Sequence, residues 1–241
     1  MSVHSLPLRM ATRRLNHADR RESILEAATA TFATRGFDGA RTLEIAEAAG
    51  ISEALLYRHF PSKQALYDAV LEHVARQQDH NFAVLQLPDP STRGLVEALW
   101  RYLDACVNGS PDRGPSNGQR ILLLSLAGDG KHARMVYERA QKIGARAFRK
   151  ALEAAAREGS LERNAIDPRN GWNFLEHVGA MIASSRLAGG SSIPYAGSRE
   201  KLLREAVLFC GRGLGLKDAA IEAHAPARPA PRERALRRGA R

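Results

Sequence analysis

The stretch that decides the fold is Thr42–Leu66, which reads TLEIAEAAGISEALLYRHFPSKQAL. Its first part predicts about two turns of helix over residues 42–49, ended by Gly50. Ser52 is a typical N-cap for a second short helix, which we expect over residues 53–60. Two short helices around a glycine turn are typical of a helix-turn-helix, in which the second helix enters the major groove of DNA.

The second helix of this pair has an inward and an outward side. Leu56 and Phe60 lie four residues apart, so they share one side of the helix and we expect them in the core. The positions that project elsewhere are Glu53, Ala54, Tyr57 and Arg58. Their mixture of small, aromatic and charged groups suits contacts with base edges and phosphates.

Helical periodicity continues on both sides of this pair, and alternating strand patterns are absent from the sequence. We expect further helices over about 19–35, 62–80, 91–108, 117–127, 129–158, 168–188 and 198–214. The predicted fold class is therefore all-α, with an N-terminal three-helix domain and a larger C-terminal helical domain. The proline- and arginine-rich tail offers little apolar surface to bury, so we expect it to be disordered.

The stretch from residue 42 to residue 66 resembles the signature of the TetR family of transcriptional repressors. The matching positions are Ile45-Ala46, Ala49-Gly50, Ser52, Leu56-Tyr57, His59-Phe60, Lys63 and Leu66, with Ile24-Leu25, Phe32 and Gly36-Phe37 upstream. The resemblance covers about residues 19–70 and is only architectural beyond residue 80. It implies a homodimer with a ligand pocket in the C-terminal domain. The implied divisions are a flexible basic arm (1–18), a helix-turn-helix domain (19–65), a ligand-binding and dimerisation domain (66–216) and a disordered tail (217–241).

The resemblance also assigns DNA contacts to individual positions. The implied DNA-binding residues are Thr42, Leu43, Ser52, Glu53, Ala54, Leu55, Tyr57, Arg58, His59 and Lys63. Lys63 would hold a phosphate, in agreement with the preference of helix N-termini for anions. Leu55 stands where the family often has threonine, and it either touches a thymine methyl group or belongs to the core. Glu53 either accepts from a cytosine amino group or repels phosphates and so sharpens specificity.

The net charge of +10 lies almost entirely in the two ends of the chain. Residues 1–21 carry a net charge of +4 and residues 223–241 a net charge of +5, whereas residues 22–65 carry −2. The arginines of the N-terminal arm that would supply positive charge to DNA are Arg13, Arg14, Arg20 and Arg21. They either reach phosphates or an adjacent minor groove, or form part of a merely solubilising arm.

The C-terminal domain lacks the sequence motifs of common enzymes. It has no Gly-x-Ser-x-Gly elbow and no phosphate-binding lysine loop, and the histidines lack metal-ligand spacing. We therefore expect neither an enzyme nor a metal or other cofactor. The candidate ligand-pocket residues are Phe82, Trp100, Tyr102, Tyr137, Trp172 and His177. Ordinary core packing is the alternative for each of them.

The last two expected helices have apolar and small residues that suit a two-fold interface of four helices. The candidate interface residues are Leu175, Val178, Gly179, Ile182, Leu202, Ala206 and Phe209. Burial of the same side chains inside one protomer is the alternative. A two-fold dimer predicts a pseudo-palindromic operator with half-sites about one turn of DNA apart.

The expected function is a dimeric, sequence-specific DNA-binding transcriptional regulator, a repressor that a small-molecule effector releases from its operator. The alternative is an architectural DNA-binding protein with no effector. The expected partners are double-stranded DNA, a second copy of the chain and an unidentified small molecule. We expect no membrane association and a cytoplasmic location, because the sequence has no signal peptide and no run of about 18 apolar residues.

Overall fold

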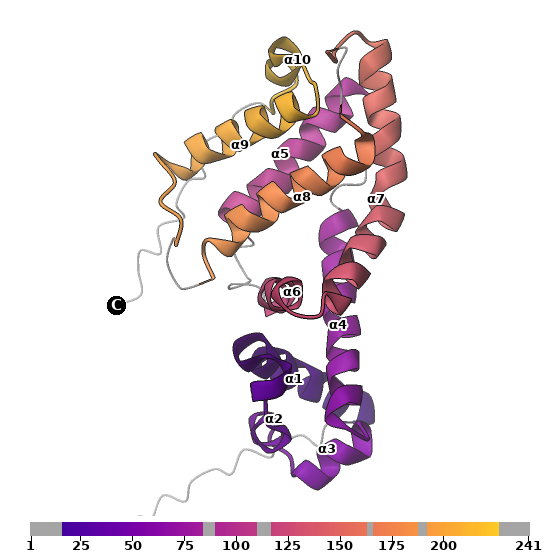
Figure 1. Ribbon diagram of the computed structural model, residues 1–241, viewed down its shortest axis with the longest axis vertical. Helices are drawn as coiled ribbons and strands as arrows, with labels where there is room; N and C mark the ends of the chain where they lie inside the picture. Colours follow the sequence, from indigo (N-terminus) through magenta and orange to yellow (C-terminus); the bar gives the residue numbers. More distant parts are fainter. Residues whose placement is uncertain (1–15, 84–89, 110–116, 163–165, 188–191, 227–241) are drawn as a thin grey trace, which may run out of the picture. The chain divides into compact units, whose positions relative to one another are not determined.

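The computed structural model describes residues 16–83, 90–109, 117–162, 166–187 and 192–226, with the backbone alone over 77–83. These residues form ten helices and no strand, which confirms the all-α prediction (Figure 1). The chain divides into an N-terminal unit, Met1–Val74, and a C-terminal unit, Ala75–Arg241.

The N-terminal unit contains α1 (His17–Gly39), α2 (Thr42–Ala48), α3 (Glu53–His59) and the first half of α4 (Lys63–Ala83). Gly36 interrupts the helical backbone of α1 with a φ of 68°, a left-handed conformation that favours glycine. The core residues of this unit include Ile24, Leu25, Phe32, Ile45, Leu56, Phe60, Leu66 and Val70. Tyr67 of α4 packs edge-on against Phe32 of α1, with 4.9 Å between ring centroids.

The sequence-based boundary between the domains, at residues 65 and 66, lies nine residues before the boundary in the structure. The first half of α4 belongs to the N-terminal unit because Tyr67 packs on α1 and His73 lies 3.5 Å from Glu22 of α1. Periodicity marks where a helix begins, but it does not show which neighbour each turn of that helix contacts.

The C-terminal unit contains α5 (Thr92–Asn108), α6 (Asn117–Ala127), α7 (Lys131–Arg157), α8 (Pro168–Ser184), α9 (Arg199–Gly213) and α10 (Asp218–Ala223). Within it, α5 packs against α7, α8 and α9 (Figure 1). Ser91, Asp167 and Ser198 cap the N-termini of α5, α8 and α9 with their side-chain oxygens. Buried side chains from these helices form one continuous apolar core.

Part of the segment that the sequence analysis expects to be disordered forms the helix α10. Ile221 is 2% exposed and packs closely on Gly211 of α9. A β-carbon added at Gly211 would lie 2.6 Å from the Ile221 side chain. Arg212 and Asp218 add a bidentate ion pair with both distances at 2.7 Å. A six-residue helix is too short to produce a recognisable periodicity, so proximity to prolines misled the prediction.

Candidate nucleic-acid interface

The second helix of the helix-turn-helix, α3, is anchored by its cap and by two core residues. The Ser52 hydroxyl accepts a hydrogen bond from the Leu55 amide at 3.2 Å. Leu56 is fully buried and Phe60, which follows the helix, is 3% exposed. The predicted core positions of this helix are thereby confirmed, and its other side is left to face outward.

The predicted DNA-binding residues divide into an exposed and a half-buried group. The exposed residues are Leu43, Ser52, Ala54, Tyr57 and Arg58, with Leu43 and Tyr57 at 52% and 41% exposure. The half-buried residues are Thr42, Glu53, Leu55, His59 and Lys63. Leu55 thus lies at the edge of the core, and part of its side chain remains accessible.

Glu53 is held by a hydrogen-bond network that the sequence did not predict. The Thr42 hydroxyl at the start of α2 donates to Glu53 Oε1 at 2.6 Å and lies 3.2 Å from the Tyr57 hydroxyl. The three side chains therefore connect α2 to α3 next to the exposed face. Thr42 and Glu53 are eleven residues apart on different helices, so no helical spacing marks them as partners.

Replacing Thr42 with valine is expected to loosen α3. The substitution keeps the shape of the side chain but removes a hydrogen bond to a charged, half-buried carboxylate, at a cost of about 1 kcal/mol. Amide hydrogen exchange of α2 and α3 in the full chain should become about fivefold faster. Thr34→Val is the matched control, since the Thr34 hydroxyl donates only to carbonyls of its own helix. Equal exchange rates in α2 and α3 of both variants would show that the network does not hold the helices together.

Lys63 opens α4, as the resemblance implies for a phosphate-binding lysine. Its ammonium group donates to the Asp38 carbonyl oxygen at 3.3 Å and lies 4.7 Å from the centre of the Phe37 ring. These contacts orient the lysine side chain along the end of α1. An ammonium group has three donors, so the hydrogen bond to Asp38 leaves capacity for an anion.

The basic arm is described only in part, because Arg13 and Arg14 lie outside the described residues. Arg20 and Arg21 belong to the first two turns of α1. The Arg21 guanidinium lies 5.0 Å from the centre of the Phe60 ring, so the start of α1 lies next to the end of α3.

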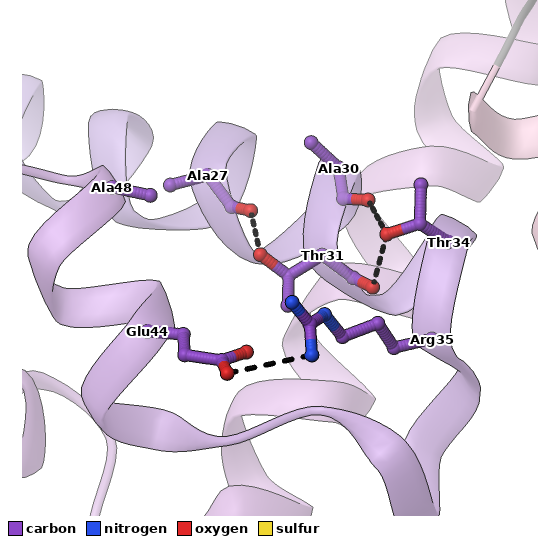
Figure 2. Close-up of a pocket in the computed structure, with 7 residues that line it drawn as sticks. All are labelled: Ala27, Ala30, Thr31, Thr34, Arg35, Glu44 and Ala48. Carbon is purple, nitrogen blue, oxygen red and sulfur yellow. Dashed lines mark hydrogen bonds and ion pairs between the residues drawn. The ribbon is translucent and has the colours of Figure 1, made fainter.

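A shallow hollow of about 650 Å³ lies between α1 and α2 in the same unit (Figure 2). It is lined by Ala27, Ala30, Thr31, Thr34, Arg35, Glu44 and Ala48. An ion pair of 3.4 Å between Arg35 and Glu44 closes one side, and the two threonine hydroxyls donate to carbonyls of α1. None of these residues is among the predicted ligand-binding residues, and the lining is mostly alanine and threonine.

The candidate ligand-pocket residues have different environments in the C-terminal unit. Trp172 is 2% exposed and packs edge-on against Phe148 in the core, whereas His177 is exposed. Trp100, Tyr102 and Tyr137 are half-buried at the edge of the core. The Phe82 side chain lies outside the described residues.

A buried carboxyl group that the sequence analysis missed lies among these residues. Glu176 of α8 is 7% exposed, and its Oε2 has no hydrogen-bond partner in the described structure. Burial raises the pKa of Glu176 above its ordinary value, although its hydrogen bond with Tyr137 acts in the opposite direction. The Tyr102 hydroxyl donates to the Glu176 backbone oxygen at 3.2 Å. The sequence does not show whether a glutamate with apolar neighbours in a helix is buried or faces water, so Glu176 was not recognised.

The candidate dimer residues also divide into two groups. Leu175, Gly179, Ile182 and Ala206 are buried in the core of the protomer itself. Val178 and Leu202 are half-buried, and Phe209 is 68% exposed. Two further apolar side chains of α8 are exposed, Phe174 at 56% and Met181 at 50%. The surface that remains open to a partner therefore includes two residues, Phe174 and Met181, that are not among the candidate interface residues.

Residues 24–70 match the family model of bacterial regulatory proteins, tetR family. The match covers α2 and α3 completely, together with most of α1 and the start of α4. This segment therefore matches the family that the sequence analysis named as a resemblance.

Two curated relatives match parts of the chain. The HTH-type transcriptional repressor NicS of Pseudomonas putida KT2440 is 36% identical over 94 residues, which are 37% of this chain and 44% of NicS. The HTH-type transcriptional regulator RutR of Escherichia coli K12 is 49% identical over 55 residues, which are 23% of this chain and 26% of RutR. The matches span less than half the length of either relative.

The solved structure of AibR in complex with isovaleryl coenzyme A and operator DNA is similar in fold to a larger part of the chain. The TM-score is 0.57 at 19% identity, and the alignment covers 82% of this chain and 100% of the AibR chain. The likeness concerns the fold alone. Among the described helices of the present chain, none combines the length and the apolar character needed to cross a membrane.

Proposed function

We propose that this protein is a dimeric, sequence-specific DNA-binding transcriptional regulator, and that it represses by binding an operator until a small-molecule effector releases it. The observation that carries the proposal is the outward face of α3. Its buried side is fixed by Leu56, while Ala54, Tyr57, Arg58 and the cap residue Ser52 are exposed. A helix that is rigidly anchored and exposes polar and aromatic groups suits docking in the major groove.

The proposed partner for the C-terminal unit is a second copy of the chain. Phe174, Val178 and Met181 have the spacing of one face of α8, and Leu202 and Phe209 have the spacing of one face of α9. The two helices are in contact, so their exposed apolar side chains support a four-helix interface. In this proposal, these exposed residues take the place of the candidate interface residues that are buried within the protomer.

The proposed effector site is the neighbourhood of Glu176. Its unpartnered carboxyl oxygen and the half-buried Tyr137 are polar groups within a largely apolar unit, as is typical of small-molecule sites. AibR, which was solved in complex with isovaleryl coenzyme A, supports a small-molecule effector in a similar fold. These functions need no membrane and no catalytic group, so we propose a cytoplasmic regulator that is not an enzyme.

The proposed function predicts that selection from a random library of duplexes with the purified protein will enrich a pseudo-palindromic site. Arg58→Ala is expected to weaken binding to that site by about 10- to 100-fold, because it removes an exposed cation from the face of α3. Arg149→Ala removes an exposed arginine of the C-terminal unit and is the control for charge alone. Binding without sequence preference would instead support the architectural alternative.

A further inference from the structure

Two histidines face each other where the start of α1 meets the end of α3. The ring centroids of His17 and His59 are 4.5 Å apart, and the rings are tilted by 35°. His59 Nδ1 is buried and has no hydrogen-bond partner in the described structure. The DNA contact that the resemblance implies for His59 does not explain this pairing, because His17 lies outside the matched motif.

Four basic side chains among the described residues disfavour a positive charge on His59. They are His17, Arg20 and Arg21 on α1 and Arg58 on α3. Burial, followed by these positive charges, lowers the pKa of His59 below its ordinary value of 6.5. The free protein therefore holds His59 in its uncharged form at neutral pH.

No carboxylate is among the described groups that act on His59. Arg21 is kept in place by its contact with the Phe60 ring, so the cations cannot simply move apart without losing that contact. The N-terminus of the 23-residue helix α1 adds its own positive potential, because His17 is the first helical residue. A phosphate diester is permanently anionic and matches a cluster of arginines and protonated imidazoles.

We propose that His17, His59 and the three neighbouring arginines form a subsite for a DNA backbone phosphate, and that binding of the phosphate is coupled to protonation of His59. The affinity of the protein for DNA then rises as the pH falls. This inference rests on the proposed function, since it assumes that α3 docks on DNA.

The direction of the pH dependence follows from linkage. An anion beside His59 favours the charged imidazole, so the pKa of His59 in the complex is higher than in the free protein. Binding takes up a proton between these two pKa values, and the dissociation constant falls by up to about tenfold for each pH unit in that interval. Above both values the histidine is neutral in both states and the dependence vanishes.

The test follows the His59 ring by NMR in the full chain between pH 5 and pH 8 at constant low ionic strength. The probe is a 30-base-pair duplex of random sequence, because phosphate contacts do not depend on sequence. We expect the titration midpoint of His59 to rise when the duplex is bound. In parallel, the dissociation constant should be several-fold lower at pH 6 than at pH 7.5.

Three variants assign the effect to the cluster. His59→Gln should flatten the dependence of the dissociation constant on pH. His17→Gln should raise the His59 midpoint in the free protein, because it removes one of the charges that disfavour the imidazolium. His224→Gln changes a histidine of the C-terminal unit and should behave as the unmodified chain does.

An unmoved His59 midpoint in the presence of bound duplex overturns the subsite and leaves DNA binding intact. The same pH dependence in His59→Gln as in the unmodified chain also overturns it. Absence of binding to any duplex at any pH overturns the proposed function and the subsite together.

Discussion

Gly144→Ala is expected to destabilise the C-terminal unit by about 2 kcal/mol, even though alanine is the better helix former. A β-carbon at Gly144 in α7 would lie 2.0 Å from the six-membered ring of Trp172 in α8. Trp172 is 2% exposed and is backed by Phe148, so it has little room to move away. Overpacking of this kind costs about 1–3 kcal/mol or more, which exceeds the gain of about 1 kcal/mol from helix propensity.

The chain provides both a probe and a control for this prediction. Both of its tryptophans, Trp100 and Trp172, lie in the C-terminal unit, so tryptophan fluorescence during urea unfolding reports on that unit alone. Gly213→Ala is the matched control, because nothing lies within 4 Å of a β-carbon at that helical position. It should be neutral or stabilising.

A double-mutant cycle tests the assigned contact. Trp172→Phe removes the ring atoms that a β-carbon at residue 144 would meet. The double variant should therefore lose less stability than the sum of the two single losses, by about 1 kcal/mol or more. Strict additivity would place the strain of Gly144→Ala somewhere other than Trp172.

The long helices could be predicted from sequence because their signals are local. Ser52, Asp167 and Ser198 all cap helices where a cap residue precedes an apolar repeat, and Leu56 and Phe60 are buried as their spacing requires. α10 was missed because its stability comes from Ile221 and Asp218 contacting residues of α9. Such contacts appear only when the chain has folded.

The candidate sites follow the same division between local and long-range information. The exposed positions Tyr57 and Arg58 follow from the helical period of α3. The hydrogen bond between Thr42 and Glu53 and the pairing of His17 with His59 join different helices, so neither spacing nor composition indicates them. In α8, apolar residues occur on both sides of the helix, so sequence alone could not separate the core residue Leu175 from the exposed Phe174.

Phe209→Glu is expected to separate the proposed dimer into protomers. Phe209 is 68% exposed in a single protomer, more than any other large apolar side chain in the described structure, so the substitution disturbs little within the protomer core. In a two-fold interface, both copies of Phe209 would be buried against the partner. The substitution would place a buried, unpaired carboxylate at each of these two positions. At about 2 kcal/mol for each copy, the dimer dissociation constant should rise by roughly 1000-fold.

Light scattering of the full chain at micromolar concentration provides the measurement, with Leu124→Glu as the control. Leu124 is also an exposed apolar residue of the C-terminal unit, at 47%, but it belongs to α6 rather than to α8 or α9. We expect this control to keep the mass of a dimer, while Phe209→Glu has the mass of one chain and an unchanged helical content. Loss of the dimer in the Leu124 variant alone would instead move the interface to α6. A dimeric mass for Phe209→Glu would remove α9 from the proposed interface, because a carboxylate at that position could not be buried against a partner without loss of affinity.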